Sequence, residues 1–371
     1  MKYARMIMEA EAPNLIGYEK MDYNLAESSV RDRSLHELGI ELGDMKLAYG
    51  HHFGETKLRE QIAQQSASNI CPDDVLVTAG AAGALFLVSS CLLEREDQII
   101  VGFPNYATNF ETPLAIGTEV VFHEQSFENN FGIDLEKLRE QITDKTKFIS
   151  LTVPHNPTGT MISENELNAL IALVEEKGIY LLFDETYRDL SYGPPLPVAA
   201  SLSKQAISVG SMSKTWGVPG IRVGWLITRN TDLIEKFVAG KEQVGITGSI
   251  VDEEIAYQVL KQRDTLLPVI KREVAANLQL LDDWVTREPI LDWVKPQGSA
   301  AALIRVKGAS DEAMNKFYAL LKGKYRIHVA PGYWFKLPLN LMRIGFCWST
   351  FDETNIALER VSEALAECFG E

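Results

Sequence analysis

The chain has 371 residues, and its 46% apolar and 23% charged residues are typical of a folded protein with a substantial core. A formal net charge of −15 would repel phosphate backbones and anionic lipid headgroups, so we expect neither nucleic acid nor a membrane as a partner. No apolar run approaches the roughly 18 residues that span a bilayer, and the start lacks a signal-peptide core, which predicts a cytoplasmic location.

Between about residues 75 and 230, short β-branched runs alternate with segments of helical periodicity. Several runs are apolar throughout, as expected of strands that are buried on both faces. This alternation predicts an α/β fold with a mostly parallel sheet, in a large domain from residue 46 to 275. The runs begin at Asp74, Gln98, Glu119, Lys147, Gly178 and Ala206.

From about residue 250 the pattern changes to long helices, predicted over residues 249–260 and 268–287. Short strands at 300–305 and 341–346 follow, and a closing helix starts near Asp352. We expect residues 276–371 to form a smaller α+β domain together with residues 1–45. The active site should lie between the two domains.

The most informative stretch runs from Ser211 to Trp225 and places Lys214 between hydroxyls and glycines, directly after a buried strand. Pyridoxal chemistry needs an amine to form an imine, hydroxyls and an arginine for a phosphate, and a tight backbone. Lys214, Ser211 and Arg222 could supply these groups. A lysine in a solvent-exposed loop with an unrelated arginine is the alternative for this stretch alone.

Together with the segments Pro154-His-Asn-Pro-Thr-Gly and Leu181-Leu-Phe-Asp-Glu-Thr-Tyr, this stretch resembles the class I/II aminotransferases of fold type I. The motifs occur in the family's order from about Tyr49 to Arg343. The resemblance implies a large domain with a seven-stranded-type sheet and pyridoxal 5'-phosphate as the cofactor. It also implies that Lys214 carries the Schiff base and acts as the general base.

Asp184 ends an apolar strand, where an aspartate often caps a helix. The resemblance instead implies that Asp184 pairs with the pyridine nitrogen, which would lower the pKa of its carboxyl group. It implies that Tyr187 and Asn156 hydrogen-bond the ring oxygen O3′, and that Asn156 also orients the substrate carboxylate. His155, beside Asn156, is expected to be a packed loop histidine rather than a base.

The segment Thr78-Ala-Gly-Ala-Ala-Gly joins a strand to a helix, and helix N-termini attract anions. A dinucleotide fingerprint is the rival interpretation, but its first glycine is missing. The resemblance implies phosphate contacts at Gly80, Ala81 and Ala82. Since residues 80–82 have no serine or threonine side chain, where family members have one, the phosphate would depend more on backbone amides, Ser211 and Arg222.

Two tyrosines match further positions of the family. Tyr106 matches the aromatic residue that stacks on the pyridine face, with an ordinary core tyrosine as the alternative. Tyr49 matches the tyrosine that reaches the phosphate of the neighbouring subunit, which implies a homodimer. His51 and His52 follow, but consecutive side chains diverge and no third ligand is evident, so we expect no metal.

Arg343 lies in a short apolar strand, where an unpaired charge is costly unless an anion meets it. The resemblance implies that Arg343 binds the substrate α-carboxylate, and a structural salt bridge is the alternative. Glu27, with Asp22 or Asp32, lies where the family often has small residues. These acids could bind a cationic, arginine-like side chain, or they could be solvated surface charges.

We therefore predict an aminotransferase that passes the amino group of an α-amino acid to a 2-oxo acid. Elimination such as C–S cleavage, decarboxylation, cyclisation and oxidation use the same lysine, aspartate and arginine and remain alternatives. A non-catalytic regulator that senses the cofactor is a further alternative. It is disfavoured because Lys214, Asp184 and Arg343 are all present.

Overall fold

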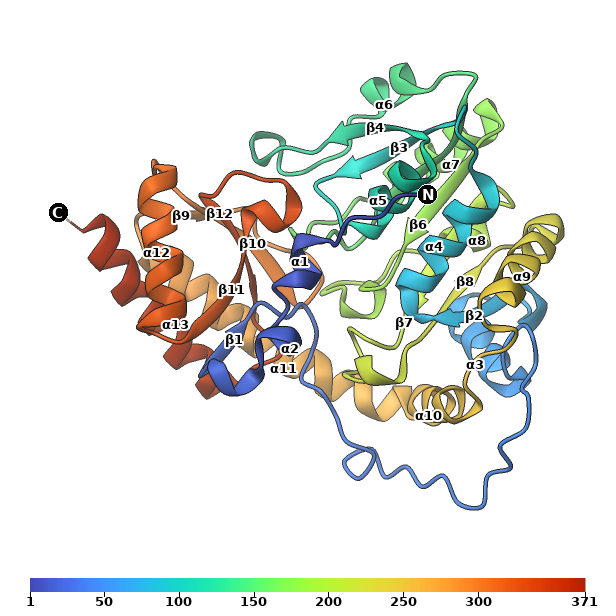
Figure 1. The fold of residues 1–371 in the computed structure, drawn as a ribbon, viewed down its shortest axis with the longest axis horizontal. Coiled ribbons are helices and arrows are strands. Elements are labelled where there is room, and N and C mark those ends of the chain that lie inside the picture. Colours follow the sequence, from blue (N-terminus) through green and yellow to red (C-terminus); the bar gives the residue numbers. More distant parts are fainter. Residues whose placement is uncertain (371) are drawn as a thin grey trace.

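The computed structural model describes residues 1–370 and contains two β-sheets of unequal size (Figure 1). The larger sheet has seven strands, and only β8 runs antiparallel to its neighbours. The predicted mostly parallel sheet is confirmed, and each of the expected runs is a strand. In spatial order the strands are β2 (Val75–Ala79), β8 (Val223–Ile227), β7 (Ala206–Ser211), β6 (Tyr180–Asp184), β5 (Thr146–Thr152), β3 (Gln98–Phe103) and β4 (Glu119–Glu124).

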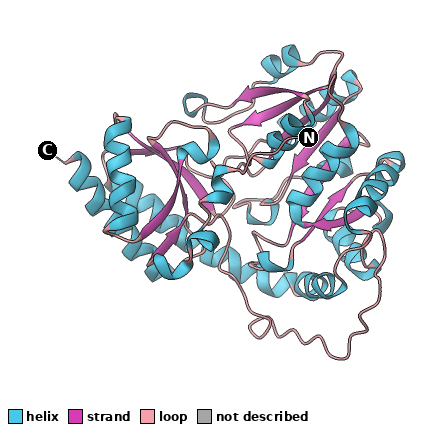
Figure 2. Ribbon diagram, in the orientation of Figure 1, coloured by secondary structure: helices cyan, strands magenta, loops and turns pink. Residues whose placement is uncertain are grey.

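Helices cover both faces of this sheet, which explains the continuous apolar runs (Figure 2). In β3, Ile99 and Val101 pack in one buried cluster, whereas Ile100 packs in another on the opposite face. One face carries α4 (Gly80–Leu92), α5 (Thr108–Ile116) and α9 (Thr231–Gly245), and the other carries α3 (Thr56–Ser66), α6 (Leu135–Gln141), α7 (Glu164–Lys177), α8 (Ala199–Leu202) and α10 (Ile250–Lys261).

The second sheet has five strands, and β1 pairs with β11 in parallel while the other pairs are antiparallel. It therefore joins residues near both ends of the sequence. Its order is β1 (Tyr23–Leu25), β11 (Ile327–Pro331), β12 (Leu341–Gly345), β10 (Ala301–Val306) and β9 (Leu291–Trp293). Two helices pack on it, α12 (Asp311–Gly323) and α13 (Phe351–Phe369).

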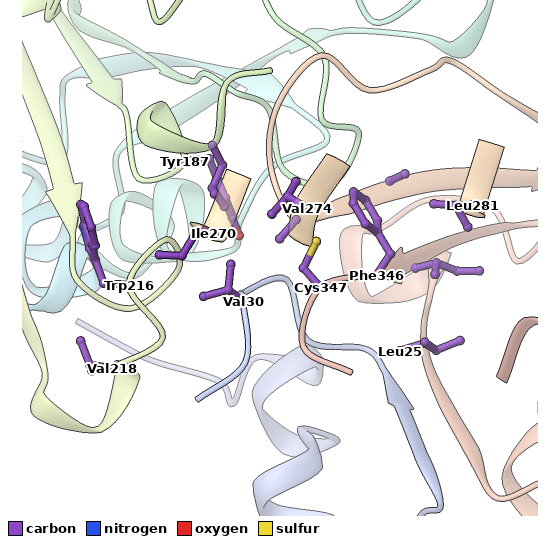
Figure 3. Packing of buried hydrophobic residues seen from close by; sticks show 14 of the residues in the cluster. Leu25, Val30, Tyr187, Trp216, Val218, Ile270, Val274, Leu281, Phe346 and Cys347 are labelled. Atoms are coloured by element: carbon purple, nitrogen blue, oxygen red, sulfur yellow. The ribbon is translucent and has the colours of Figure 1, made fainter. Parts of the chain in front are cut away.

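A long helix, α11 (Arg263–Arg287), connects the parts of the chain that form the two sheets. It begins five residues before the predicted start, because Pro268 lies inside the helix rather than in its first turn. Ile270 and Val274 of α11 pack in the same buried cluster as Tyr187 and Phe346 (Figure 3). The predicted boundary at residue 275 falls within this helix, so the division into two domains stays a prediction.

The N-terminal segment crosses from one sheet to the other (Figure 1). The amide of Lys2 donates to the carbonyl of Ala115 in α5, and β1 then joins the smaller sheet. The crossing contains α1 (Ile7–Ala10) and α2 (Pro13–Ile16). After β1 the chain makes a largely exposed excursion at residues 41–52, without helix or strand, before α3 begins (Figure 2).

Short 3₁₀ helices occupy several connections between these elements. They are Tyr18–Lys20, Pro72–Asp74, Phe127–Asn129, Arg188–Leu190, Pro219–Ile221 and Gly332–Phe335.

Within residues 1–370, no helix is both long and apolar enough to cross a membrane.

The loop after β5 is held by His155, which is buried. Its Nε2 lies 2.7 Å from the carbonyl oxygen of Pro104, and its Nδ1 lies 2.8 Å from the hydroxyl of Thr158. Burial lowers the pKa of His155 to about 4. The expected packed loop histidine is confirmed, and the ring fixes the turn that carries Asn156.

Gly345 allows the segment after β1 to pack directly on β12. A methyl group at this position would overlap the carbonyl oxygen of Glu27. We expect Gly345→Ala to lower the free energy of unfolding by about 1–3 kcal/mol, because the backbones must separate. Gly323→Ala is the control, since nothing lies within 4 Å of its added carbon, and it should change stability by less than about 1 kcal/mol. Equal effects in denaturant titrations would contradict the close packing.

The low pKa of His155 predicts a pH dependence of stability. The folded state keeps the ring neutral, whereas the unfolded chain takes up a proton near pH 6.5, so stability present above pH 6.5 is lost as the pH falls toward 4. Between pH 7 and pH 5 the wild type should lose about 2 kcal/mol more than His155→Gln. Urea titrations at both pH values measure this difference, and parallel curves for the two proteins would refute it.

Candidate active site

A cavity of about 580 Å³ opens where the parallel strands of the larger sheet end. Thr152, Asp184 and Ser211 are the last residues of β5, β6 and β7, and all three line the cavity. Ligands of open α/β sheets commonly bind at this edge. Of the predicted site residues, the cavity is lined by Glu27, Ala81, Ala82, Tyr106, Asn156, Asp184, Tyr187, Ser211, Lys214, Arg222 and Arg343.

Lys214 is half-buried and belongs to a loop whose backbone is fixed at several points. The amide of Val30 donates to the carbonyl of Lys214 at 3.0 Å. The Ser211 hydroxyl accepts from the amide of Ser213 at 3.1 Å, and Arg222 Nη1 donates to the Ser213 hydroxyl at 3.3 Å. Lys214 thus lines the same cavity as two hydroxyls and a guanidinium, which is the set of groups expected from the sequence.

The first turn of α4 forms a cradle together with Arg222. Gly80 has φ +70°, and a carbon added there would lie 2.5 Å from Arg222 Nη2. A carbon added at Gly224 would lie 2.6 Å from the amide nitrogen of Ala81. Only glycine permits this approach of backbone amides to the arginine. A helix N-terminus facing a guanidinium suits a phosphate, so the chain's own residues fit the expected cofactor here.

Asp184 is buried at the end of β6, and Thr186 donates to its Oδ1 twice, from the amide at 3.1 Å and from the hydroxyl at 2.6 Å. Burial raises the pKa of Asp184, although the bonds from Thr186 and the charge of Lys214 act in the opposite direction. Within residues 1–370, no basic side chain forms an ion pair with this carboxylate. The lowered pKa expected from a charged partner on the cofactor therefore stays a prediction. A protonated ring nitrogen from a ligand would supply the missing charge.

Arg343 is also buried, and it lies across the cavity on β12. Its Nη1 donates to Asn156 Oδ1 at 2.9 Å and its Nη2 to the carbonyl of Ala26 at 2.6 Å, whereas its Nε has no acceptor. In the described part of the chain no carboxylate forms an ion pair with it, so the alternative of a structural salt bridge is not realised. The planar guanidinium can therefore receive a carboxylate from a ligand.

Three polar side chains complete the wall between these charges. Tyr187 lies with its hydroxyl 2.8 Å from that of Ser28, and Tyr106 donates to Glu9 at 3.1 Å. Burial, and next the charge of Glu9, raise the pKa of Tyr106. Because Asn156 Oδ1 accepts from Arg343, its Nδ2 amino group is directed elsewhere and can act as a donor.

The acidic residues that were considered for the substrate side chain separate into two groups. Glu27 and Asp32 line the cavity. Asp22, which directly precedes β1, does not line it and instead pairs with Arg326 at 2.7 Å. The sequence could not distinguish them, since Asp22 and Asp32 lie at similar distances from Glu27 along the chain.

Tyr49 and the neighbouring histidines lie away from the cavity. Tyr49 is 86% exposed in the excursion before α3, so its expected role toward a neighbouring subunit stays a prediction. The Nδ1 atom of His52 lies 2.5 Å from Oε1 of Glu242. Residues 1–370 contain no group of three or more histidine, cysteine, aspartate or glutamate side chains that could hold a metal ion.

Several lining residues were not predicted. Ser213 directly precedes Lys214, and Thr186 directly precedes Tyr187. Their hydroxyls are therefore visible in the sequence beside two predicted residues. The N-terminal segment supplies Met8, Glu9, Ala12, Pro13, Asn14 and Tyr18. That segment has no periodic pattern, so the sequence contained no signal that it forms a wall of the cavity.

Comparison with known proteins is consistent with this geometry. A Dictyostelium discoideum tyrosine aminotransferase is 29% identical over 82% of this chain and 77% of its own length. A capreomycidine synthase from Streptomyces vinaceus is 28% identical, over 93% of this chain and 87% of its own length. Among solved structures, a PLP-dependent aminotransferase from Streptococcus suis matches with a TM-score of 0.92 and 28% identity, over the whole of both chains.

A second solved structure, the PLP-dependent cyclase OrfR, matches with a TM-score of 0.87 and 25% identity over 98% of each chain. The similar proteins thus include both aminotransferases and a cyclase. The family model described as aminotransferase class I and II matches residues 24–361. The chain therefore belongs to the class I and II aminotransferases, a family of fold type I enzymes that use pyridoxal phosphate.

Proposed function

We propose that this protein is a pyridoxal-phosphate-dependent aminotransferase that passes the amino group of an α-amino acid to a 2-oxo acid. One observation carries the proposal: Lys214, Asp184 and Arg343 come from three separate segments and line a single cavity. The amine, the buried acid and the buried guanidinium correspond to three requirements of the reaction. These are cofactor attachment, ring activation and substrate binding.

The chain's own residues would hold the cofactor at both ends. The amides of Gly80, Ala81 and Ala82, with Ser211 and Arg222, would bind the phosphate. Asp184 would keep the ring nitrogen protonated, while Tyr187 and Asn156 would bond the ring hydroxyl and Tyr106 would cover one face. When bound, pyridoxal phosphate supplies the aldehyde that condenses with an amine and the ring that withdraws electrons from Cα.

Lys214 would have two roles. Its Nζ would attach the cofactor in the resting enzyme, and as a free amine during the reaction it would act as the base that moves the proton from the substrate Cα. Arg343 would fix the α-carboxylate and Asn156 would orient it, so that the Cα–H bond faces the lysine.

We propose a homodimer as the active form. Leu47 and Tyr49 are 76% and 86% exposed in the excursion at residues 41–52, which is an unusual position for large apolar and aromatic side chains. In the proposed dimer this excursion lies on the neighbouring subunit, and Tyr49 reaches the phosphate bound there.

Cyclisation of an amino acid is the second candidate. The capreomycidine synthase and the cyclase OrfR support it, because each matches this chain over most of its length. Elimination, decarboxylation and oxidation have no such support among these proteins. The products distinguish the candidates, since aminotransfer requires an acceptor oxo acid and cyclisation does not.

Replacing Lys214 tests the proposal. With purified, cofactor-loaded wild type, a screen of amino donors and oxo-acid acceptors should give one oxo acid and one new amino acid per turnover. Borohydride should fix the cofactor to Lys214, as detected by peptide mass spectrometry. Lys214→Ala should reduce turnover at least about 1,000-fold through loss of the base. The exposed Lys204→Ala is the control and should retain activity. Turnover without an acceptor would rule out aminotransfer.

Replacing Asp184 separates cofactor binding from activation. Asp184→Ala should lower kcat at least about 100-fold, because the ring nitrogen loses its counter-charge, while cofactor affinity changes less than about tenfold. An N-methylated cofactor carries a fixed positive charge and should restore part of the activity. Asp189→Asn, which alters a carboxylate paired with Arg263, is the control. Parallel losses of affinity and turnover would show that Asp184 only supports binding.

A further inference from the structure

The cavity contains more carboxylates than the proposed chemistry uses. Arg222, Lys214 and Arg343 each have a role toward phosphate, amine or carboxylate, and Asp184 has one toward the ring. Glu9, Glu27 and Asp32 also line the cavity and have no such role, and of these Glu9 accepts a hydrogen bond from Tyr106. Glu27 is half-buried and Asp32 is exposed, so both carboxylates are open to a ligand.

These two carboxylates lie around one aromatic side chain, Tyr18. Burial raises the pKa of Tyr18 to about 12, and the charges of Glu27 and Asp32 contribute in the same direction. Tyr18 is stacked on Trp348, with ring centroids 5.5 Å apart and planes 8° apart. Trp348 Nε1 donates to Asp32 Oδ2 at 3.0 Å, which holds that carboxylate in place.

Neither carboxylate has an ion-pair partner in the described part of the chain, although the charges of Lys214 and Arg31 act on Asp32. Among residues 1–370, Glu27 and Asp32 form no ion pair, whereas Asp22 in the same segment pairs with Arg326. Burial also raises the pKa of Asp32, although the bond from Trp348 and the charge of Lys214 oppose this effect. Two acids beside an aromatic face form a suitable site for a planar cation.

Arg343 provides independent evidence that the cavity takes a ligand with a negatively charged group. Its side chain is 97% buried, its Nε has no acceptor, and it lines the same cavity without an ion-pair partner in the described chain. Glu27 is near enough for its charge to act on Arg343, yet the guanidinium bonds Asn156 and Ala26 instead. The same cavity thus offers Arg343 to an anion and Glu27 with Asp32 to a cation.

We propose that the amino acid substrate has a guanidinium-type cation at the end of its side chain, held by Glu27 and Asp32 against Tyr18. Its α-carboxylate meets Arg343, and the amino group lies between them at Lys214. This inference rests on the proposed function for the orientation of the substrate. The cation subsite itself depends only on the cavity.

Binding of unreactive analogues tests the subsite without turnover. Desamino-arginine and desamino-citrulline have the same shape and carboxylate but differ in the charge at the far end. The cofactor-loaded enzyme should bind desamino-arginine at least about tenfold more tightly, as measured from the cofactor's absorption spectrum. Equal affinities would overturn the inference.

Glu27→Gln and Asp32→Asn, singly and together, test the residues. The double variant should reduce the preference for desamino-arginine to less than about threefold, with little change for desamino-citrulline. Asp22→Asn is the matched control and should keep the wild-type ratio. A general disturbance of the cavity would weaken the binding of both analogues equally. If the double variant kept the wild-type ratio of the two affinities, other residues would cause the preference, and this subsite would be refuted.

Turnover distinguishes this inference from the proposed function. The ratio of kcat/KM for arginine over citrulline should follow the binding ratio through the same variants. Selective binding of the cationic analogue without any transfer of an amino group would retain the subsite and reject aminotransfer. Efficient transfer from neutral amino acids with no preference for the cation would retain aminotransfer and reject the subsite.

Discussion

The carboxylate of Asp184 and the guanidinium of Arg343 are buried on facing parts of two different sheets, and within the described chain neither has a counter-ion. Removing a charge from water costs several kcal/mol, so this arrangement persists only because strands β6 and β12 fix both side chains. The stability of the rest of the fold has to exceed this cost. The cluster around α11 contributes, since Ile270 and Val274 pack with residues from both sheets.

Rigid backbone positions these groups more than side-chain contacts do. Glycine at Gly80 and Gly224 lets the first turn of α4 lie against Arg222, and Gly345 lets the segment around Glu27 lie on β12. A larger residue at any of these positions would move a wall of the cavity rather than one side chain. The ends of strands and the starts of helices move little, so side chains placed there are held more precisely than side chains on loops.

The extent of sequence-based prediction followed the strength of local patterns. Strands buried on both faces are apolar throughout, so β3, β6 and β7 could be predicted, and Lys214, Asp184, Asn156 and Arg343 could be placed by resemblance. Strand β8 was missed because Val223–Ile227 contains a glycine and overlaps the stretch that was interpreted as the lysine loop. The lowered pKa expected for Asp184 depends on a charge that the protein's own residues do not supply, so it stays a prediction. Tyr18 had no signal, since only the tertiary fold brings its irregular segment to the cavity.

The pairing of β1 with β11 has a consequence for biosynthesis. Residues 23–25 leave the ribosome early, but their partners at 327–329 are made some 300 residues later. Until then, the segment that holds Tyr18 and Glu27 has no sheet to join. A chain arrested before residue 327 would therefore contain Lys214 but could not complete the cavity wall to which Tyr18 and Glu27 belong.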